Sequence, residues 1–319
     1  FAFFTRSGWA SVNGGSAGVA QVLWGGDQLT TWDREDGFAT IVPISAHAGL
    51  AGMSIFGSDI AGYTAVFNPP STKELFFRWT ALAAFHPSMR THHGSAVCGN
   101  WSFDRDAETI AHFRRWARVH TLLYPTFRAL LEEAMADGMP ITRHPYLVEP
   151  GFDVLWRDAE YGTFLGDDVY VAPVLTPATV LREVSLPSSG WWPLFGDAPL
   201  AGDASGDGRV HATVDVPTTE IAAFVRPGTA IVLLGEVVDS FYGATSPGVT
   251  DLDDVARWRR LALYPDAAGA VRPVDVDGWR VEATGWNDAA LDAATWNGAP
   301  LAACATDAAP PGRSEERHV

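Results

Sequence analysis

The chain has 319 residues, 47% of them hydrophobic, and a formal charge of −16. This length and composition allow a sizeable core and predict more than one domain. The negative charge argues against a nucleic acid or an anionic membrane surface as a partner, and no stretch reaches the apolar length of a membrane span. Because Cys98 and Cys304 are far apart in the sequence, neither a disulfide framework nor a thiolate metal site is expected.

The first predicted strand covers residues 19–23, which form a short apolar run bounded by glycines. It is followed by Trp24, two glycines that permit a turn, and Asp27. A carboxylate at the carboxyl end of a buried strand, next to a tryptophan, has the position of a general acid in a barrel enzyme. Taken alone, Asp27 is better explained as the N-cap of a following helix, since Asp is a favoured capping residue.

A second strand and a second carboxylate follow. The run 53–57 is strand-like and leads to Asp59, and the residues between the two strands, 36–52, fit a helix in which Pro43 is out of place. A further helix is predicted after Ser71-x-x-Glu74, which has the spacing of a capping box. Alternating strands and helices indicate right-handed crossovers and a parallel sheet, so the two acidic loops should meet at one edge.

Several short motifs now occur in an order that is far more specific than any one of them. They are Arg6-Ser7-Gly8, Trp24-Gly25-Gly26-Asp27-Gln28, Asp59-Ile60-Ala61-Gly62-Tyr63, Glu74-Leu75-Phe76-Phe77-Arg78-Trp79, Met89-Arg90-Thr91-His92 and Val171-Ala172-Pro173-Val174. Over about residues 1–230 the chain therefore resembles glycoside hydrolase family 31, the α-glucosidase and α-xylosidase family. The resemblance implies an α/β fold, with the C-terminal half of a (β/α)8 TIM barrel over residues 1–150 followed by an antiparallel β-sandwich.

The resemblance also implies a role for each candidate site residue. Asp27 would be the general acid/base, with Trp24 as its apolar neighbour, and Arg6 and His92 would hydrogen-bond sugar hydroxyls. Asp59 would support the site or bind a hydroxyl, and a structural cap is the alternative for it. Considered alone, His92 would be better explained as a satisfied core histidine.

Within the family the chain is most similar to the sulfoquinovosidases. It has Gly26-Asp27-Gln28 where α-glucosidases have Gly-Asp-Asn, Tyr63 where they usually have Phe, and a matching stretch from residue 72 to residue 92. A sulfonate is always anionic, and the Tyr63 hydroxyl can donate to it where a Phe cannot. The expected activity is that of a retaining exo-α-glycosidase on α-sulfoquinovosides. The alternatives are a family 31 α-glucosidase or α-xylosidase, a non-catalytic carbohydrate-binding relative, and an inactive fragment.

A glycosidase that retains the anomeric configuration requires a second carboxylate, about 5–5.5 Å from the first, as the nucleophile. In the family this Asp lies on an earlier barrel strand, so we expect it and the sulfonate-binding Arg and Trp upstream of Phe1, and we expect the chain alone to be inactive. The expected partner is a small-molecule glycoside and the expected location is the cytoplasm. No cofactor is expected, and no metal either: the loop 203–208 resembles a calcium site, but Val214 stands where the bidentate Glu is needed.

A long helical stretch is predicted over residues 106–138, in which Pro125 either causes a kink or opens a second helix. The basic residues of this stretch are His112, Arg114, Arg115, Arg118 and His120. We interpret them as part of a solvent-exposed helix face and not as a nucleic-acid-binding patch. Residues 140–147 resemble the last barrel strand of the family, so the barrel would close near Glu149.

Beyond residue 150 the sequence changes to short apolar runs separated by Gly, Pro, Asp and Ser, which is typical of an antiparallel sandwich. We assign the sandwich to 151–240, a reduced distal β-region to 241–309, and a disordered tail to 310–319. Trp191 and Trp192 could form a sugar platform, but aromatic residues on sandwich strands more often belong to the core.

Overall fold

The computed structural model describes residues 4–5, 21–96, 99–149, 162–202, 205–206, 208–241, 243, 245–255, 258–276, 279–281, 295–296 and 299–300. Arg6, Cys98, Cys304 and the tail expected at 310–319 lie outside these residues. The domain limits at residues 150, 240 and 309 stay predictions. Among the described residues, no helix has both the length and the apolar character needed to cross a membrane.

The N-terminal unit is built around four parallel strands whose order in the sheet is their order in the sequence. This is the strand order of a barrel, although the strands described here form an open sheet and not a closed barrel. The elements up to the fourth helix are β1 (Phe4–Thr5), β2 (Val22–Trp24), η2 (Phe38–Thr40), α1 (Ile41–Leu50), β3 (Phe56–Ile60), α2 (Lys73–Ala83), β4 (Ser88–Thr91), α3 (Ala107–Leu122) and α4 (Tyr124–Asp137).

Both prolines that complicated the helix predictions occupy first turns. Pro43 is the third residue of α1, and Pro125 is the second residue of α4. A proline is harmless there because the N–H groups of the first turn have no intrahelical partner. The predicted stretch 106–138 is therefore two helices, of which Asp106 caps the first and Gly138, with φ 85°, ends the second.

The predicted capping box at Ser71 is wrong by one residue. The N-cap of α2 is Thr72, whose hydroxyl accepts a hydrogen bond from a backbone N–H of the first turn. Ser71 Oγ accepts instead from the N–H of Trp101, at 2.8 Å, and the Glu74 carboxylate accepts from the N–H of Ala178, at 3.0 Å. Ser71 and Glu74 therefore stabilise contacts to other segments and not the start of their own helix.

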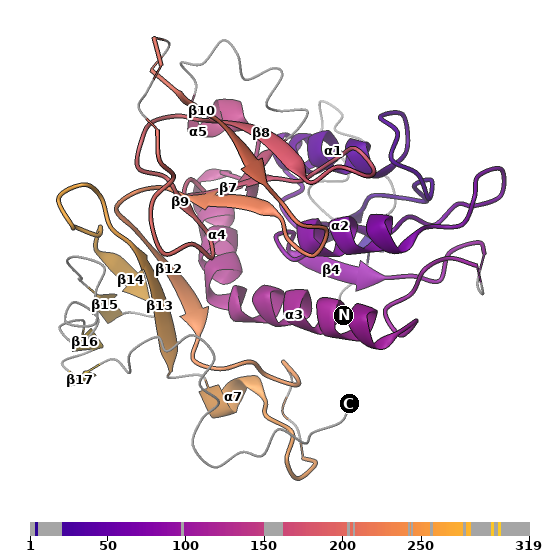
Figure 1. Ribbon diagram of the computed structural model, residues 1–319. Coiled ribbons are helices and arrows are strands. Elements are labelled where there is room, and N and C mark those ends of the chain that lie inside the picture. The colour runs from indigo at the N-terminus through magenta and orange to yellow at the C-terminus, as the bar shows by residue number, and fades with distance from the viewer. Residues whose placement is uncertain are drawn as a thin grey trace.

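The core of this unit lies between the sheet and α2, most of whose residues are buried. Figure 1 shows α2 beside β4. Trp79 on α2 is fully buried and its ring centroid lies 5.0 Å from that of Phe38. The Trp79 indole N–H donates to Ser58 Oγ at 2.9 Å, so the polar end of this large side chain is satisfied on β3. Trp79 thus holds β3, and the loop that follows β3, against the helix layer.

The expected last barrel strand pairs elsewhere. β5 (Thr142–Arg143) is antiparallel to β6 (Thr163–Leu165) and belongs to the sheet of the C-terminal unit. The pairing is extended by a hydrogen bond from the Gly166 N–H to the Ile141 carbonyl at 3.0 Å, and the buried Arg143 forms ion pairs with Asp167 and Glu133. These bonds fix β5 to the turn after β6, which explains why it is not part of the parallel sheet.

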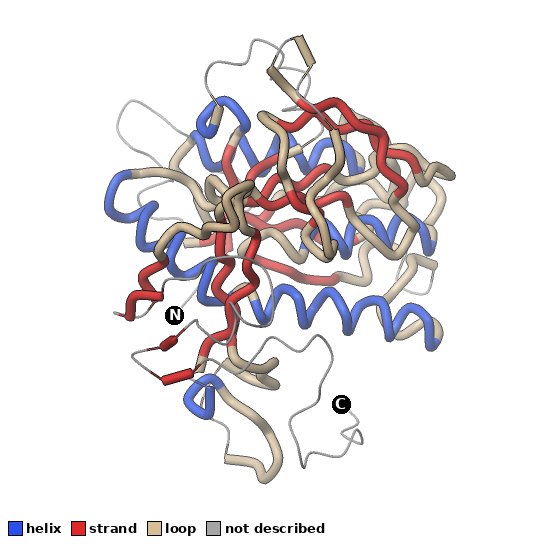
Figure 2. Tube along the Cα trace, turned by 60° about the vertical axis from the view of Figure 1, so that its left-hand side comes forward, coloured by secondary structure: helices blue, strands red, loops and turns tan. Residues whose placement is uncertain are grey.

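The C-terminal unit contains a five-stranded sheet in the order β5-β6-β7-β11-β9 and a β8–β10 pair, all antiparallel as predicted. Trp191 is fully buried and Trp192 is 8% exposed, which confirms that both belong to the core. The β12–β13 pair lies beside α4, and Figure 2 shows the same helices and strands from another side. The remaining elements are α5 (Pro145–Val148), β7 (Val169–Ala172), β8 (Leu181–Leu186), β9 (Trp192–Pro193), β10 (Val210–Asp215), β11 (Ala222–Val225), β12 (Thr229–Leu234), α7 (Leu252–Val255), β13 (Arg259–Tyr264), β14 (Val274–Val276), β15 (Trp279–Val281), β16 (Thr295–Trp296) and β17 (Ala299–Pro300).

Arg78 on α2 joins the two units. Its side chain is 2% exposed, and its guanidinium donates to the backbone carbonyls of Thr179 at 2.8 Å, Val216 at 3.0 Å and Pro217 at 2.8 Å. A buried cation needs such acceptors because water cannot solvate it. One side chain of the N-terminal unit therefore binds two separate segments of the C-terminal unit.

The basic residues of α3 also take part in packing. Arg115 forms an ion pair with Glu220, and the His112 ring stacks on Phe77 with centroids 3.9 Å apart. His120 Nδ1 lies 3.1 Å from the carbonyl oxygen of Ala84. These three side chains are directed toward neighbouring elements of the fold.

Candidate active site

The candidate residues gather where β2, β3 and β4 end. Trp24 is the last residue of β2, and Asp27 follows three residues later; Asp59 is in β3, Tyr63 comes three residues after that strand, and His92 directly follows β4. Because the strands are parallel, their carboxyl ends lie on the same edge of the sheet. Five of the six predicted residues are therefore brought to one edge, and the sixth, Arg6, lies outside the described residues.

The centre of this edge is an ion pair between neighbouring strands. Asp59 and Arg90 are register partners on β3 and β4, and Arg90 Nε lies 2.9 Å from Asp59 Oδ1. The Arg90 guanidinium also lies over two aromatic rings, 5.3 Å from the centroid of Trp24 and 5.4 Å from that of Phe4. Aromatic faces attract a cation, so the guanidinium is held by a carboxylate and by rings.

Asp59 is fully buried, and burial raises its pKa above the ordinary value. The positive charge of Arg90 and the nearby His92 oppose that rise, as does a hydrogen bond from Trp24, whereas the Asp27 carboxylate adds to it. The Asp27 carboxylate is thus close enough to Asp59 to influence its pKa, and Arg90 on β4 acts in the opposite direction.

The loops that carry these side chains are tied together by backbone hydrogen bonds. The carbonyl of Gln28 accepts from the N–H groups of Tyr63, at 2.8 Å, and Thr64, at 2.9 Å. Thr64 Oγ1 donates to the Asp27 carbonyl at 2.9 Å, and the N–H of Ser95 donates to the Tyr63 carbonyl at 2.8 Å. The loops after β2, β3 and β4 therefore form one connected layer, which fixes Asp27 and Tyr63 relative to each other.

Tyr63 and His92 lie side by side, with ring centroids 5.0 Å apart. His92 Nδ1 accepts a hydrogen bond from the Gly94 N–H at 2.9 Å, so the neutral imidazole carries its proton on Nε2. His92 is exposed and not a core histidine. The pair can present a phenol hydroxyl and an imidazole N–H to a ligand.

Two glycines and one alanine show how closely this layer is packed. A Cβ on Gly57 would lie 2.5 Å from the Ser88 carbonyl oxygen, and one on Gly94 would lie 2.5 Å from that of Tyr63. Ala61, which is almost fully buried, has φ 71°, a left-handed conformation that favours glycine. The backbone between Asp59 and Tyr63 is therefore strained, as is common at functional sites.

Arg90 is part of the motif Met89-Arg90-Thr91-His92, but the sequence alone does not predict its role. The sequence does contain a signal for this role. An arginine in an otherwise strand-like run needs a hydrogen-bond acceptor for its guanidinium, and the preceding parallel strand supplies Asp59. The missing information was the register, which places these two residues opposite each other.

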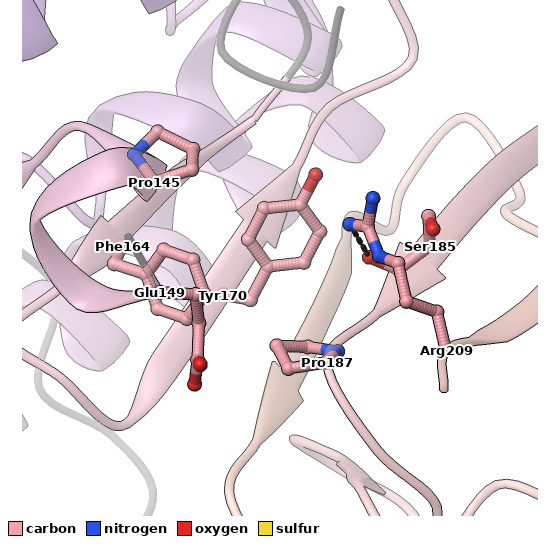
Figure 3. Close-up of a pocket in the computed structure, with 7 residues that line it drawn as sticks. All are labelled: Pro145, Glu149, Phe164, Tyr170, Ser185, Pro187 and Arg209. Atoms are coloured by element: carbon pink, nitrogen blue, oxygen red, sulfur yellow. Dashed lines mark hydrogen bonds between the residues drawn. The ribbon is translucent and has the colours of Figure 1, made fainter. Parts of the chain in front are cut away.

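A small cavity lies elsewhere, between α5, the strands β6, β7 and β8, and Arg209 (Figure 3). Its volume is about 10 Å³, which is enough for about one water molecule. Arg209 donates to the Ser185 carbonyl at 3.0 Å beside it. This cavity is too small for a sugar and is not a candidate site.

Comparison with known proteins identifies the family. The profile of the Glycosyl hydrolases family 31 TIM-barrel domain matches residues 2–130, and that of the Glycosyl hydrolase family 31 C-terminal domain matches residues 138–231. The chain belongs to glycoside hydrolase family 31. Among relatives, sulfoquinovosidases of Escherichia coli K12 and Agrobacterium fabrum are each 35% identical over 70% of the chain.

A solved structure of the same family is also similar to this chain. A family 31 sulfoquinovosidase from E. rectale, in complex with an aza-sugar inhibitor, is 31% identical and has a TM-score of 0.60 over 65% of this chain and 30% of its own. The chain spans 31% and 32% of the lengths of the two curated sulfoquinovosidases. The two family profiles, which match residues 2–130 and 138–231, include the sheet edge with the candidate residues.

Proposed function

We propose that the protein containing this chain is a retaining exo-α-glycosidase that hydrolyses α-sulfoquinovosides. The observation that carries the proposal is the cluster of Trp24, Asp27, Asp59, Tyr63 and His92 at the ends of three parallel strands. The similarity to sulfoquinovosidases supports the substrate class.

In this proposal Asp27 is the general acid/base. It protonates the leaving oxygen as the glycosidic bond breaks and then removes a proton from the water that hydrolyses the glycosyl-enzyme intermediate. The half-buried position of Asp27, on a turn held by Thr64, suits a group that must reach the substrate and keep its direction.

The nucleophile would be an aspartate on a barrel strand preceding residue 1. The Asp59–Arg90 pair would supply fixed charges beside the reacting sugar, and His92 and Arg6 would hydrogen-bond its hydroxyls. We further propose that residues 1–319 alone have no turnover, since both carboxylates are needed.

The sulfonate would be bound in part by Tyr63. Its hydroxyl can donate to an anion, and the adjoining His92 ring helps to set its orientation. With a Phe in this position, as expected in α-glucosidases, that donor would be absent. Tyr63 therefore favours a sulfoquinovoside over an ordinary α-glucoside or α-xyloside, the second candidate class.

The reaction type can be tested with the full-length protein and a nitrophenyl α-sulfoquinovoside. Proton NMR of the first-formed sugar, recorded before mutarotation, should show the α-anomer, because two displacements retain configuration. Initial release of the β-anomer would contradict the double displacement, and absence of any release would favour a non-catalytic carbohydrate-binding protein.

A further inference from the structure

A second concave surface lies on the C-terminal unit, away from the candidate residues. Its volume is about 340 Å³, within the lower range of small-ligand sites. The groove is formed by the segments 193–196, 214–217 and 220–224, which belong to β9, β10, β11 and the loops around them. None of the described residues that are proposed for the active site lines it.

One end of the groove has an exposed aromatic ring. Phe195 is 53% exposed, and its ring lies 6.0 Å from the buried Trp116, between centroids, with the Arg115 guanidinium 5.5 Å away. A large apolar side chain that is held from behind and open in front is a platform for a flat apolar ligand face.

Two carboxylates line the groove, and the Arg115 guanidinium lies beside one of them and over the Phe195 ring. Glu220 is bound by Arg115, whose Nη2 lies 2.8 Å from Oε2, and Asp215 is exposed at the end of β10. Fixed carboxylates and a guanidinium can accept from and donate to hydroxyl groups. Two carboxylates against one cation, on a chain with a charge of −16, disfavour an anionic ligand.

We propose that this groove binds a neutral saccharide chain, with one sugar ring stacked on Phe195 and its hydroxyls bonded to Asp215, Glu220 and Arg115. The apolar C–H face of a pyranose fits the aromatic ring, and its hydroxyls fit the charged rim. This neutral ligand differs in charge from the sulfonated sugar that is proposed as the substrate of the active site. The groove would therefore hold the protein on a neutral glycan, and it would not bind the substrate of the active site.

Affinity electrophoresis of the full-length protein in native gels that contain soluble starch or dextran tests this proposal without turnover. The wild-type protein should be retarded by one of these polymers, and Phe195→Ala should bind roughly tenfold more weakly. Phe103→Ala, which removes another exposed aromatic ring, should be retarded like the wild type. Because the assay does not depend on catalysis, it remains informative if the proposed activity is wrong.

Two results would overturn the proposal. One is equal mobility of the wild-type protein with and without both polymers, and the other is equal retardation of Phe195→Ala and the wild type. If Phe195→Ala in the second case also changes the oligomeric state, the groove is covered by a second copy of the protein and not by a saccharide.

Discussion

Arg90 Nε lies 2.9 Å from Asp59 Oδ1, and the two residues face each other across the parallel strands β4 and β3. The carboxylate is fully buried, whereas the arginine side chain is 26% exposed and lies over Trp24. A charge inside a protein is tolerated only when it is paired. Asp59 and Arg90 therefore contribute both to the stability of the site and to its electrostatics.

Arg90→Met should therefore destabilise the full-length protein. Removal of one partner of a buried pair costs about 3–5 kcal/mol, because the other charge is left without compensation. The measurement is urea unfolding at neutral pH. Adding Asp59→Asn should recover part of the loss, and a double variant as unstable as the single one would show that the pair does not carry this stability.

Acid should also destabilise the fold through buried histidines. Burial lowers the pKa of His86 to about 3 and that of His112 to about 4, both from 6.5. The unfolded chain therefore takes up protons first, so the stability present above pH 6.5 is lost progressively as the pH falls toward these values. His86→Leu should reduce the loss of unfolding free energy between pH 7 and pH 4 by about 2–3 kcal/mol.

The control for this measurement is His93→Leu, since His93 is exposed. It should leave the pH dependence of the unfolding free energy unchanged. Equal pH profiles for the wild type and His86→Leu would contradict the proposed origin of the acid sensitivity.

Arg78→Met should loosen the contact between the two units. The substitution leaves the carbonyls of Thr179, Val216 and Pro217 without their donor, at a cost of about 1–3 kcal/mol for each carbonyl that stays buried. Differential scanning calorimetry should show a lower Tm. Arg128→Met is the matched control, because its pair with Glu132 is exposed and should contribute less than about 1 kcal/mol.

Much of the fold follows from local sequence signals. The strand-loop-helix alternation predicted the parallel sheet, and Pro125 and Gly138 marked the limits of α4 because each has a conformational preference that needs no tertiary contact. The predicted N-cap of α2 is wrong by one residue because Ser71 and Thr72 are both good caps, and the choice depends on a hydrogen bond that the Trp101 N–H, on a distant segment, donates to Ser71 Oγ.

The pairing of β5 with β6 could not be predicted for a related reason. A two-residue strand has almost no pattern of its own, and its partner is decided by Arg143, whose ion pairs reach Glu133 and Asp167. In the site, the motifs predicted which residues gather, but the strand register revealed that Arg90 stands opposite Asp59.

The proposed general acid/base role of Asp27 has a distinct kinetic signature. Asp27→Asn removes proton donation while the shape of the side chain is kept, so kcat should fall by roughly 10²–10⁴-fold on a glyceryl glycoside. The loss should be smaller on a nitrophenyl glycoside, whose leaving group needs little protonation. Asp36→Asn, a nearby exposed carboxylate, should keep wild-type rates, and equal losses on both substrates in Asp27→Asn would exclude the acid role.

The substrate proposal is tested most directly by the ratio of kcat/KM for an α-sulfoquinovoside to that for the matching α-glucoside. The full-length wild type should prefer the sulfoquinovoside, and Tyr63→Phe should lower that ratio by roughly 10–100-fold, equivalent to a lost hydrogen bond to a charged group of about 1.5–3 kcal/mol. Tyr146→Phe, at an exposed tyrosine of α5, should leave the ratio unchanged. An unchanged ratio in Tyr63→Phe, or a wild-type preference for the glucoside, would contradict the account.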